Sequence, residues 1–214
     1  MAALIKAAAA PDFPAEISLV ISNKAAALGL EKARASGVKT LLIESKPFGK
    51  DRAGFEAMLQ RALDDKKVEL ICLGGFMRLF TAEFVQRWYG KMLNIHPSLL
   101  PCFPGLDPHG QALKAGVKIS GATVHFVIPE TDAGPIVVQG AVAVADDDTP
   151  ETLAARVIQI EHRIYPEALR LLASDRLRLE SDVCRTATGT ASDGTLISPA
   201  ANVTSAPAEK IPPG

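Results

Sequence analysis

The stretch VELICLGG, residues 68–75, decides the fold class of this chain. It is apolar at nearly every position, whereas a strand with one face in water alternates apolar and polar side chains. A nearly continuous apolar run is typical of a parallel strand that is covered on both faces. The run therefore predicts an α/β fold in which helices lie on both sides of a sheet.

On both sides of this stretch, strand patterns alternate with amphipathic helix patterns. The expected order is strand 16–22, helix 24–37, strand 39–44, helix 51–66, strand 68–75, helix 81–90 and strand 91–95. This rhythm predicts a mostly parallel sheet. The later strand patterns at 120–128 and 134–144 have no helix between them, so an antiparallel C-terminal pair is expected. A long helix over 148–174 follows.

Composition divides the chain into one domain and a tail. The strand and helix patterns lie within residues 1–180, a length that suits one sizeable domain. From residue 181 onward, Ser, Thr, Ala, Gly and Pro dominate without periodicity. We therefore expect a domain over 1–180 and a flexible C-terminal tail over 181–214.

Charge and cysteine content exclude several classes of protein. The net charge of -1 shows no excess of basic residues of the kind that nucleic-acid-binding proteins carry. No apolar run is long enough to span a membrane. The cysteines, Cys72, Cys102 and Cys184, are far apart and show no metal-ligand spacing, which suits a reducing cytosol. The sequence thus predicts a cytoplasmic protein that uses no metal and binds neither nucleic acid nor membrane.

Polar side chains mark the end of the strand at 91–95. Asn94 and His96 are two positions apart, so they point to the same face, and Pro97 then ends the hydrogen-bonding ladder. Asp132 lies in the turn between the last two strands. An amide and a protonated imidazole can stabilise a developing oxyanion, and a carboxylate can hold the imidazole. A structural histidine and an ordinary turn aspartate are the alternative interpretation of these residues.

Four motifs together resemble the formyltetrahydrofolate-dependent formyltransferases. They are GGFMRLF from residue 74, NIHPSLLPCFPGL from residue 94, GATVHFV from residue 121 and TDAGPIVVQ from residue 131. The resemblance runs from about Met1 to Glu180, and it is strongest to the branch that formylates 5'-phosphoribosylglycinamide (GAR) in purine biosynthesis. It implies a Rossmann-like formyltransferase fold with Asn94, His96 and Asp132 as catalytic residues.

The resemblance also implies ligands and their contacts. The cosubstrate is 10-formyltetrahydrofolate, the acceptor is the amine of GAR, and no metal takes part. The implied folate contacts are Arg52, Met77, Arg78, Leu79, Phe80, Asn94, Ile128, Pro129, Glu130, Thr131 and Asp132. The implied GAR contacts are Ile158, Gln159, Ile160 and Glu161, with Glu161 placed to accept from the substrate amine. The sequence leaves a monomer and a homodimer both open.

The start of the chain departs from the family pattern. Family members begin with a central strand and a Gly-x-Gly-Ser-Asn loop that holds the GAR phosphate, whereas this chain starts inside the helix that follows. We therefore expect the first central strand to be missing from between strands 16–22 and 68–75, with two edges left unpaired. A misplaced start within a longer natural chain and a genuinely truncated protein both fit. The chain as written is expected to be poorly soluble and nearly inactive.

Other functions compete with GAR formylation. A degenerate or truncated paralogue that binds folate without activity would explain the missing loop, although the intact Asn94, His96 and Asp132 argue against it. A formyltetrahydrofolate deformylase would carry an N-terminal regulatory domain and no match to GFMR. A methionyl-tRNA formyltransferase would add a C-terminal tRNA-binding domain. GAR formylation is therefore the expected activity.

Overall fold

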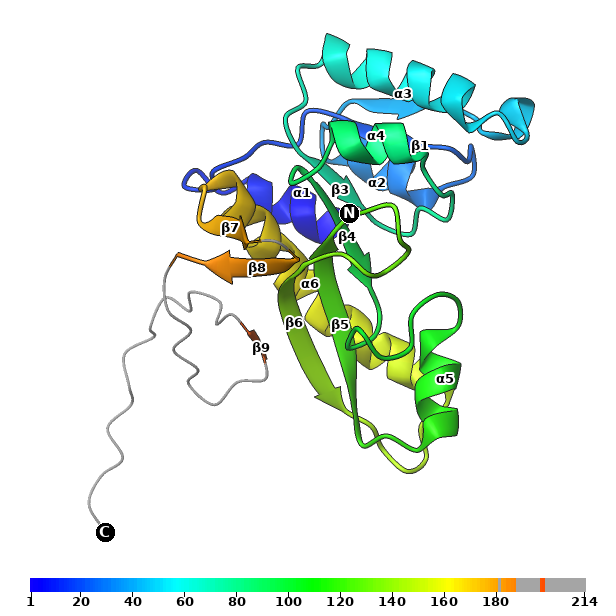
Figure 1. Ribbon diagram of the computed structural model, residues 1–214, viewed down its shortest axis with the longest axis vertical. Helices are drawn as coiled ribbons and strands as arrows, with labels where there is room; N and C mark the ends of the chain where they lie inside the picture. Colours follow the sequence, from blue (N-terminus) through cyan, green and yellow to red (C-terminus); the bar gives the residue numbers. More distant parts are fainter. Residues whose placement is uncertain (181, 188–196, 199–214) are drawn as a thin grey trace.

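The computed structural model describes residues 1–180, 182–187 and 197–198 (Figure 1). Its helices are α1 (Ala2–Ala8), α2 (Leu28–Ala35), the 3-10 turn η1 (Lys46–Phe48), α3 (Arg52–Asp65), α4 (Ala82–Arg87), α5 (Pro108–Ala115) and α6 (Pro150–Ala173). Its strands are β1 (Val20–Ser22), β2 (Thr40–Leu42), β3 (Ile71–Leu73), β4 (Met92–His96), β5 (Ile119–Phe126), β6 (Ile136–Ala143), β7 (Leu177–Glu180), β8 (Val183–Thr186) and β9 (Ile197–Ser198). The expected α/β fold is confirmed.

The sheet is mixed, with parallel pairs early in the chain and antiparallel pairs later. β1 and β2 are parallel, and a separate sheet has the strand order β3-β4-β5-β6-β9. In that sheet β3 and β4 are parallel, whereas β5 pairs antiparallel with both β4 and β6. The expected C-terminal antiparallel pair is therefore confirmed as β5 and β6. The β4–β5 pairing was not specified by the sequence, and it places Asn94 directly opposite His125.

A cleft lies where the missing central strand was expected. Among the described residues, β1 pairs only with β2 and β3 only with β4, so each has one unpaired edge. A cavity of about 660 Å³ is lined by residues of both strands, and Leu4 of α1 and Tyr165 of α6 also border it. The three early strands, β1, β2 and β3, are shorter than expected, at three residues each. The expected gap is confirmed within the described residues.

The larger core lies between α6 and the sheet. Buried apolar side chains of β4, β5, β6 and α6 form it, as helix α6 crosses these strands (Figure 1). Gly140 of β6 allows the close approach, since a Cβ at this position would overlap the side chain of Ile160. The Tyr165 hydroxyl donates to the carbonyl oxygens of Leu73 (2.6 Å) and Leu93 (3.2 Å). Helix α6 is thereby anchored to β3 and β4 next to the strand ends that carry the site.

A second core lies under α3 and α4. Five phenylalanine rings follow one another with centroid separations of 4.7 to 6.3 Å: Phe48, Phe55, Phe76, Phe80 and Phe84. The indole of buried Trp88 donates to Gln60 Oε1 at 2.9 Å. The buried Glu56 carboxylate accepts from the Thr81 backbone N–H (2.7 Å) and hydroxyl (2.5 Å). These bonds hold the start of α4 against α3, directly after segment 77–80.

Threonine side chains cap the starts of α4 and α6. Thr81 accepts from the Phe84 N–H at 3.3 Å and begins α4. Thr149 and Thr152 form a reciprocal capping box, and Pro150 takes the first position of α6. These side chains satisfy backbone donors that would otherwise lack partners in the first helical turn.

The structure moves the start of the predicted tail. Residues of β8 lie within the region expected to be flexible, yet β8 pairs antiparallel with β7. Leu177, Leu179 and Cys184 of this hairpin pack against the larger core, because alternate residues of each strand face inward. β9 likewise pairs with β6. The rest of the predicted tail, at 181, 188–196 and 199–214, lies outside the described residues.

Candidate active site

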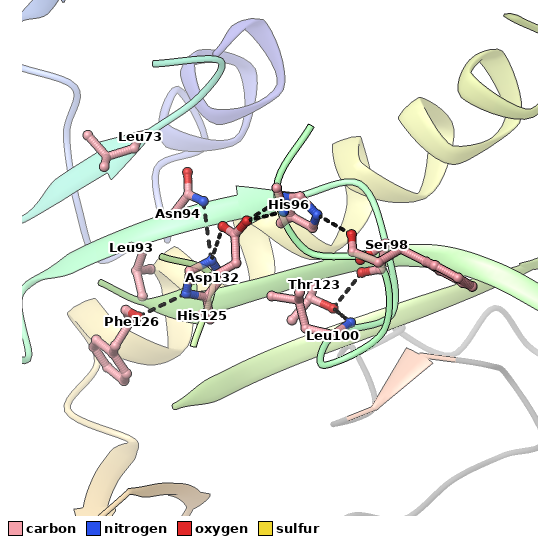
Figure 2. Close-up of polar contacts among 12 residues, drawn as sticks. Leu73, Leu93, Asn94, His96, Ser98, Leu100, Thr123, His125, Phe126 and Asp132 are labelled. Carbon is pink, nitrogen blue, oxygen red and sulfur yellow. Dashed lines mark hydrogen bonds and ion pairs between the residues drawn. The ribbon is translucent and has the colours of Figure 1, made fainter. Parts of the chain in front are cut away.

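Strand β4 carries two of the predicted catalytic side chains. Asn94 and His96 lie at its carboxyl end, and β5 pairs with them through His125 and Thr123 respectively. His96 is 6% exposed, whereas Asn94 is half-buried. Figure 2 shows Asn94, His96, His125 and Asp132 turned toward one another. The structure therefore brings the three predicted residues together and adds a fourth.

Both ring nitrogens of His96 face oxygen acceptors. Nε2 lies 2.9 Å from the carbonyl oxygen of Phe103, and Nδ1 lies 3.4 Å from Asp132 Oδ2. A carbonyl and a carboxylate can only accept, so two N–H donors of an imidazolium satisfy this arrangement completely. Both edges of the His96 ring thus face acceptors, and the Asp132 carboxylate is placed to orient the ring.

Asp132 is held in a tight turn after β5. Its backbone adopts the left-handed conformation, with φ of 54°, which aspartate tolerates better than most residues. Its Oδ2 also accepts from the Gly105 N–H at 2.9 Å, and Oδ1 lies 3.7 Å from His125 Nε2. The side chain is 9% exposed. One carboxylate therefore links the turn, both histidines and the loop that follows β4.

His125 was not predicted as a site residue. Its Nδ1 lies 2.9 Å from the Phe126 carbonyl oxygen, and its Nε2 lies 3.2 Å from Asn94 Nδ2. Burial lowers the pKa of His125, opposed by the Phe126 hydrogen bond and the Asp132 charge. The strand alternation places His125 on the face opposite to Val124 and Phe126. That signal was present in the sequence, but the register against β4 was needed to locate its partner.

A polar network shapes the loop after His96. The Ser98 hydroxyl donates to the Cys102 carbonyl at 2.6 Å. The Thr123 hydroxyl donates to the Ser98 carbonyl at 2.7 Å and accepts from the Leu100 N–H at 3.0 Å. Gln139 of β6 donates to the Leu100 carbonyl at 2.9 Å. Strands β5 and β6 thus fix the loop that brings the Phe103 carbonyl to His96 and the Gly105 N–H to Asp132.

The predicted folate residues of the early loops also meet. A pocket of about 420 Å³ is lined by Gly49, Lys50, Arg52, Met77, Arg78 and Leu79. The Arg78 guanidinium donates to the Gly49 carbonyl at 3.0 Å and lies 5.1 Å from the Phe55 ring centroid. Phe80, in contrast, belongs to the row of stacked rings. Lys50 was not predicted, and its place beside Arg52 gives this pocket a cationic wall.

The remaining predicted contacts differ in exposure. Segment 128–132 is the turn between β5 and β6, in which Pro129, Glu130 and Thr131 are exposed. On α6, Ile158 and Gln159 are exposed and Glu161 is half-buried, and burial raises the pKa of the Glu161 carboxyl group. Ile160 is buried against Gly140, so the structure does not bring its side chain to an open surface. The helical period accounts for this, since neighbouring residues of α6 face different sides.

Two features are not found in the described part of the chain. No group of three or more His, Cys, Asp and Glu side chains there is arranged to hold a metal ion. None of the helices described is both long and apolar enough to cross a membrane.

A family model described as formyl transferase matches residues 1–169. The chain belongs to the formyl transferase family. The trifunctional purine biosynthetic protein adenosine-3 of Gallus gallus is 50% identical over 177 residues, which are 83% of this chain and 18% of that protein. This chain therefore spans less than a fifth of the length of that relative.

Two further members of the family match over most of their own length. The phosphoribosylglycinamide formyltransferase of Escherichia coli is 38% identical over 180 residues, which cover 84% of each chain. The crystal structure of glycinamide ribonucleotide transformylase 1 from Symbiobacterium toebii has a TM-score of 0.83 and 44% identity, covering 86% of this chain and 87% of that one. A formyltetrahydrofolate deformylase from Pseudomonas syringae is less similar, with 27% identity and a TM-score of 0.73.

Proposed function

We propose that this chain transfers the formyl group of 10-formyltetrahydrofolate to the amine of GAR in purine biosynthesis. The observation that carries the proposal is that Asn94, His96 and Asp132 meet at the carboxyl end of β4. There, His96 Nδ1 lies 3.4 Å from Asp132 Oδ2. An amide, an imidazole and a carboxylate suit acyl transfer to an amine. Relatives named for this activity or for purine biosynthesis share 38% to 50% of the aligned residues.

Each of the three side chains has a role in this reaction. The GAR amine attacks the formyl carbon, and the formyl oxygen becomes an oxyanion that an N–H of the Asn94 amide and the positive charge of the His96 ring stabilise. The carbon–nitrogen bond to the folate then breaks, and a proton passes from the attacking amine to the leaving folate nitrogen. Asp132 orients the His96 ring and supports this proton transfer. The products are formylated GAR and tetrahydrofolate.

The ligand contacts extend the proposal beyond these three residues. The pocket beside Arg52, Met77 and Arg78 would take part of the folate, with the turn 128–132 completing its site. The cations of this pocket suit a ligand that carries carboxylates. Glu161 would accept a hydrogen bond from the GAR amine. Ile160 is left out of this assignment, because its side chain is buried.

A formyl-transfer assay run with and without GAR separates the competing functions. Formylated GAR as the product supports the proposal, whereas formate released without GAR identifies a deformylase. Folate binding without either product identifies an inactive paralogue. His96→Ala and Asp132→Asn should each lower kcat about 10²- to 10³-fold with a smaller change in KM, since both act on the transition state. A His96→Ala variant with parental kcat would refute the catalytic assignment.

A further inference from the structure

His125 occupies a position that the proposed reaction does not yet use. It is 3% exposed and lies directly across the β4–β5 pair from Asn94. Directly opposed residues on neighbouring strands have their side chains in contact. A buried imidazole costs free energy unless its polar atoms find partners, and here both nitrogens have one.

The partner of Nδ1 determines the tautomer of His125. The Phe126 carbonyl oxygen, 2.9 Å from Nδ1, can only accept a hydrogen bond, so the proton of a neutral ring lies on Nδ1. Nε2 then carries a lone pair and can only accept. Burial lowers the pKa of His125 and favours this neutral ring.

The tautomer in turn determines the orientation of the Asn94 amide. Nε2 lies 3.2 Å from Asn94 Nδ2, and a lone pair at Nε2 requires the NH₂ end of the amide to face it. Figure 2 shows the amide nitrogen turned toward His125 and the amide oxygen turned away. With one N–H bonded to His125, the second N–H of Asn94 remains available as a donor.

We propose that His125 is a positioning residue, whose imidazole holds the Asn94 amide in the orientation that presents an N–H to the formyl oxyanion. This inference rests on the proposed formyl transfer. Without the His125 acceptor, the amide can turn over and place its oxygen where the oxyanion forms. Gly134 packs against this arrangement, since a Cβ there would overlap the Phe126 carbonyl oxygen and lie 3.5 Å from His125 Nδ1.

Two charged or titratable groups face His125. Asp132 Oδ1 is 3.7 Å from His125 Nε2, and its charge raises the pKa of His125. The charge of His96, on the neighbouring strand, lowers the pKa of His125. Protonation would turn His125 Nε2 into a donor. Two donors, Nε2–H and the Asn94 NH₂, would then face each other, and Nε2–H would bond to the Asp132 carboxylate instead. Acid should therefore disrupt the amide orientation before it unfolds the protein.

The first experiment compares His125→Leu with His125→Gln in the formyl-transfer assay. Leucine removes the acceptor, so kcat should fall about 10- to 100-fold while KM changes by about twofold or less. Glutamine can present an oxygen to Asn94, so the kcat of the His125→Gln variant should stay within about threefold of the parent. This variant should also lack the loss of activity in acid that His125 protonation causes in the parent. A glutamine variant as impaired as the leucine variant, or with the parental pH profile, would overturn the proposal.

The second experiment repeats His125→Leu in an Asn94→Ala background. If His125 acts through Asn94, the added loss in kcat should be about twofold or less, because the amide is already gone. An equal loss in both backgrounds shows that His125 acts independently, which refutes the proposal. Thermal melting of each variant confirms that the compared proteins are folded.

A third measurement reads the tautomer without any turnover. Proton–nitrogen correlation spectra of the protein labelled at histidine should show the His125 proton on Nδ1 and a bare Nε2 at neutral pH. A proton on Nε2 overturns this inference alone, whatever the activity. A parent that shows the expected tautomer but stays inactive even after the family's strand and Gly-x-Gly-Ser-Asn loop are added before Met1 refutes the proposed function and, with it, the catalytic part of this inference.

Discussion

The Glu56–Thr81 contact allows a quantitative prediction about stability and folate binding. Glu56 of α3 is 6% exposed, and each of its carboxylate oxygens accepts one hydrogen bond from Thr81. Replacing Glu56 with alanine removes both bonds and leaves the Thr81 backbone N–H without its acceptor. Thr81 also caps α4, so the first turn of that helix should loosen together with segment 77–80.

The magnitude follows from the kind of bonds that are lost. A hydrogen bond to a charged acceptor contributes about 1.5–3 kcal/mol, and removing the carboxylate also removes the cost of burying its charge. We therefore expect Glu56→Ala to lower the free energy of unfolding by about 2–4 kcal/mol. For a chain of this size, that corresponds to a fall in Tm of about 5–15 °C. Glu56→Gln keeps one acceptor oxygen and should lose about half as much.

The assay is thermal melting followed by circular dichroism, with calorimetric titration of a folate analogue on the same samples. Asp65→Ala is the matched control, because it removes an exposed carboxylate from the same helix and should change stability by about 0.5 kcal/mol or less. Folate affinity should fall in the Glu56→Ala variant and not in the control. If the Glu56→Ala variant has the same Tm as the Asp65→Ala control, the contact does not stabilise the start of α4 and the reasoning is refuted.

Three further predictions concern the folate pocket, the cleft and acid. Arg78→Ala removes the bond to Gly49 and the contact over Phe55, so a folate analogue should bind about tenfold more weakly by calorimetry; unchanged affinity in both Arg78→Ala and Asp132→Ala would contradict the pocket assignment. An apolar strand and a glycine-rich loop added before Met1 should fill the cleft between β1 and β3, and should raise both Tm and formyl transfer; equal values for both proteins would show that the cleft takes no strand. Burial lowers the pKa of His125 and His109, so below about pH 6.5 the unfolded state binds more protons than the folded state. Stability to urea should therefore fall as the pH falls below about 6.5, and less steeply in His125→Gln; a pH-independent midpoint in this range would contradict the burial argument.

Local patterns in the sequence determined most helices and the faces of the strands. Helix α3 runs over Arg52–Asp65 against an expected 51–66, because its apolar residues recur at helical spacing and Asp51 caps it. The same-face rule placed Asn94 beside His96, and the structure agrees. Such features depend on neighbours a few residues apart, which a single sequence displays directly.

Features that depend on distant partners were less accessible. The role of His125 depends on the β4–β5 register, which joins residues 31 positions apart. The hairpin of β7 and β8 was missed because its alternation is short and its surroundings are rich in Ser, Thr and Ala. Ile160 was carried over from a family segment as one block, although a helix turns its consecutive residues to different sides.

The place of Trp88 gives this protein an internal reporter of partial unfolding. It is the chain's single tryptophan, and it lies in the second core with α3 and α4. Helix α6, the longest helix described, belongs instead to the larger core and contributes strongly to far-ultraviolet dichroism. Among the described residues β1 and β3 do not pair, so no ladder hydrogen bonds join the sheet of β1 and β2 to the sheet that begins with β3. Tryptophan fluorescence and dichroism should therefore follow different transitions, and one free energy of unfolding would then not describe the whole chain.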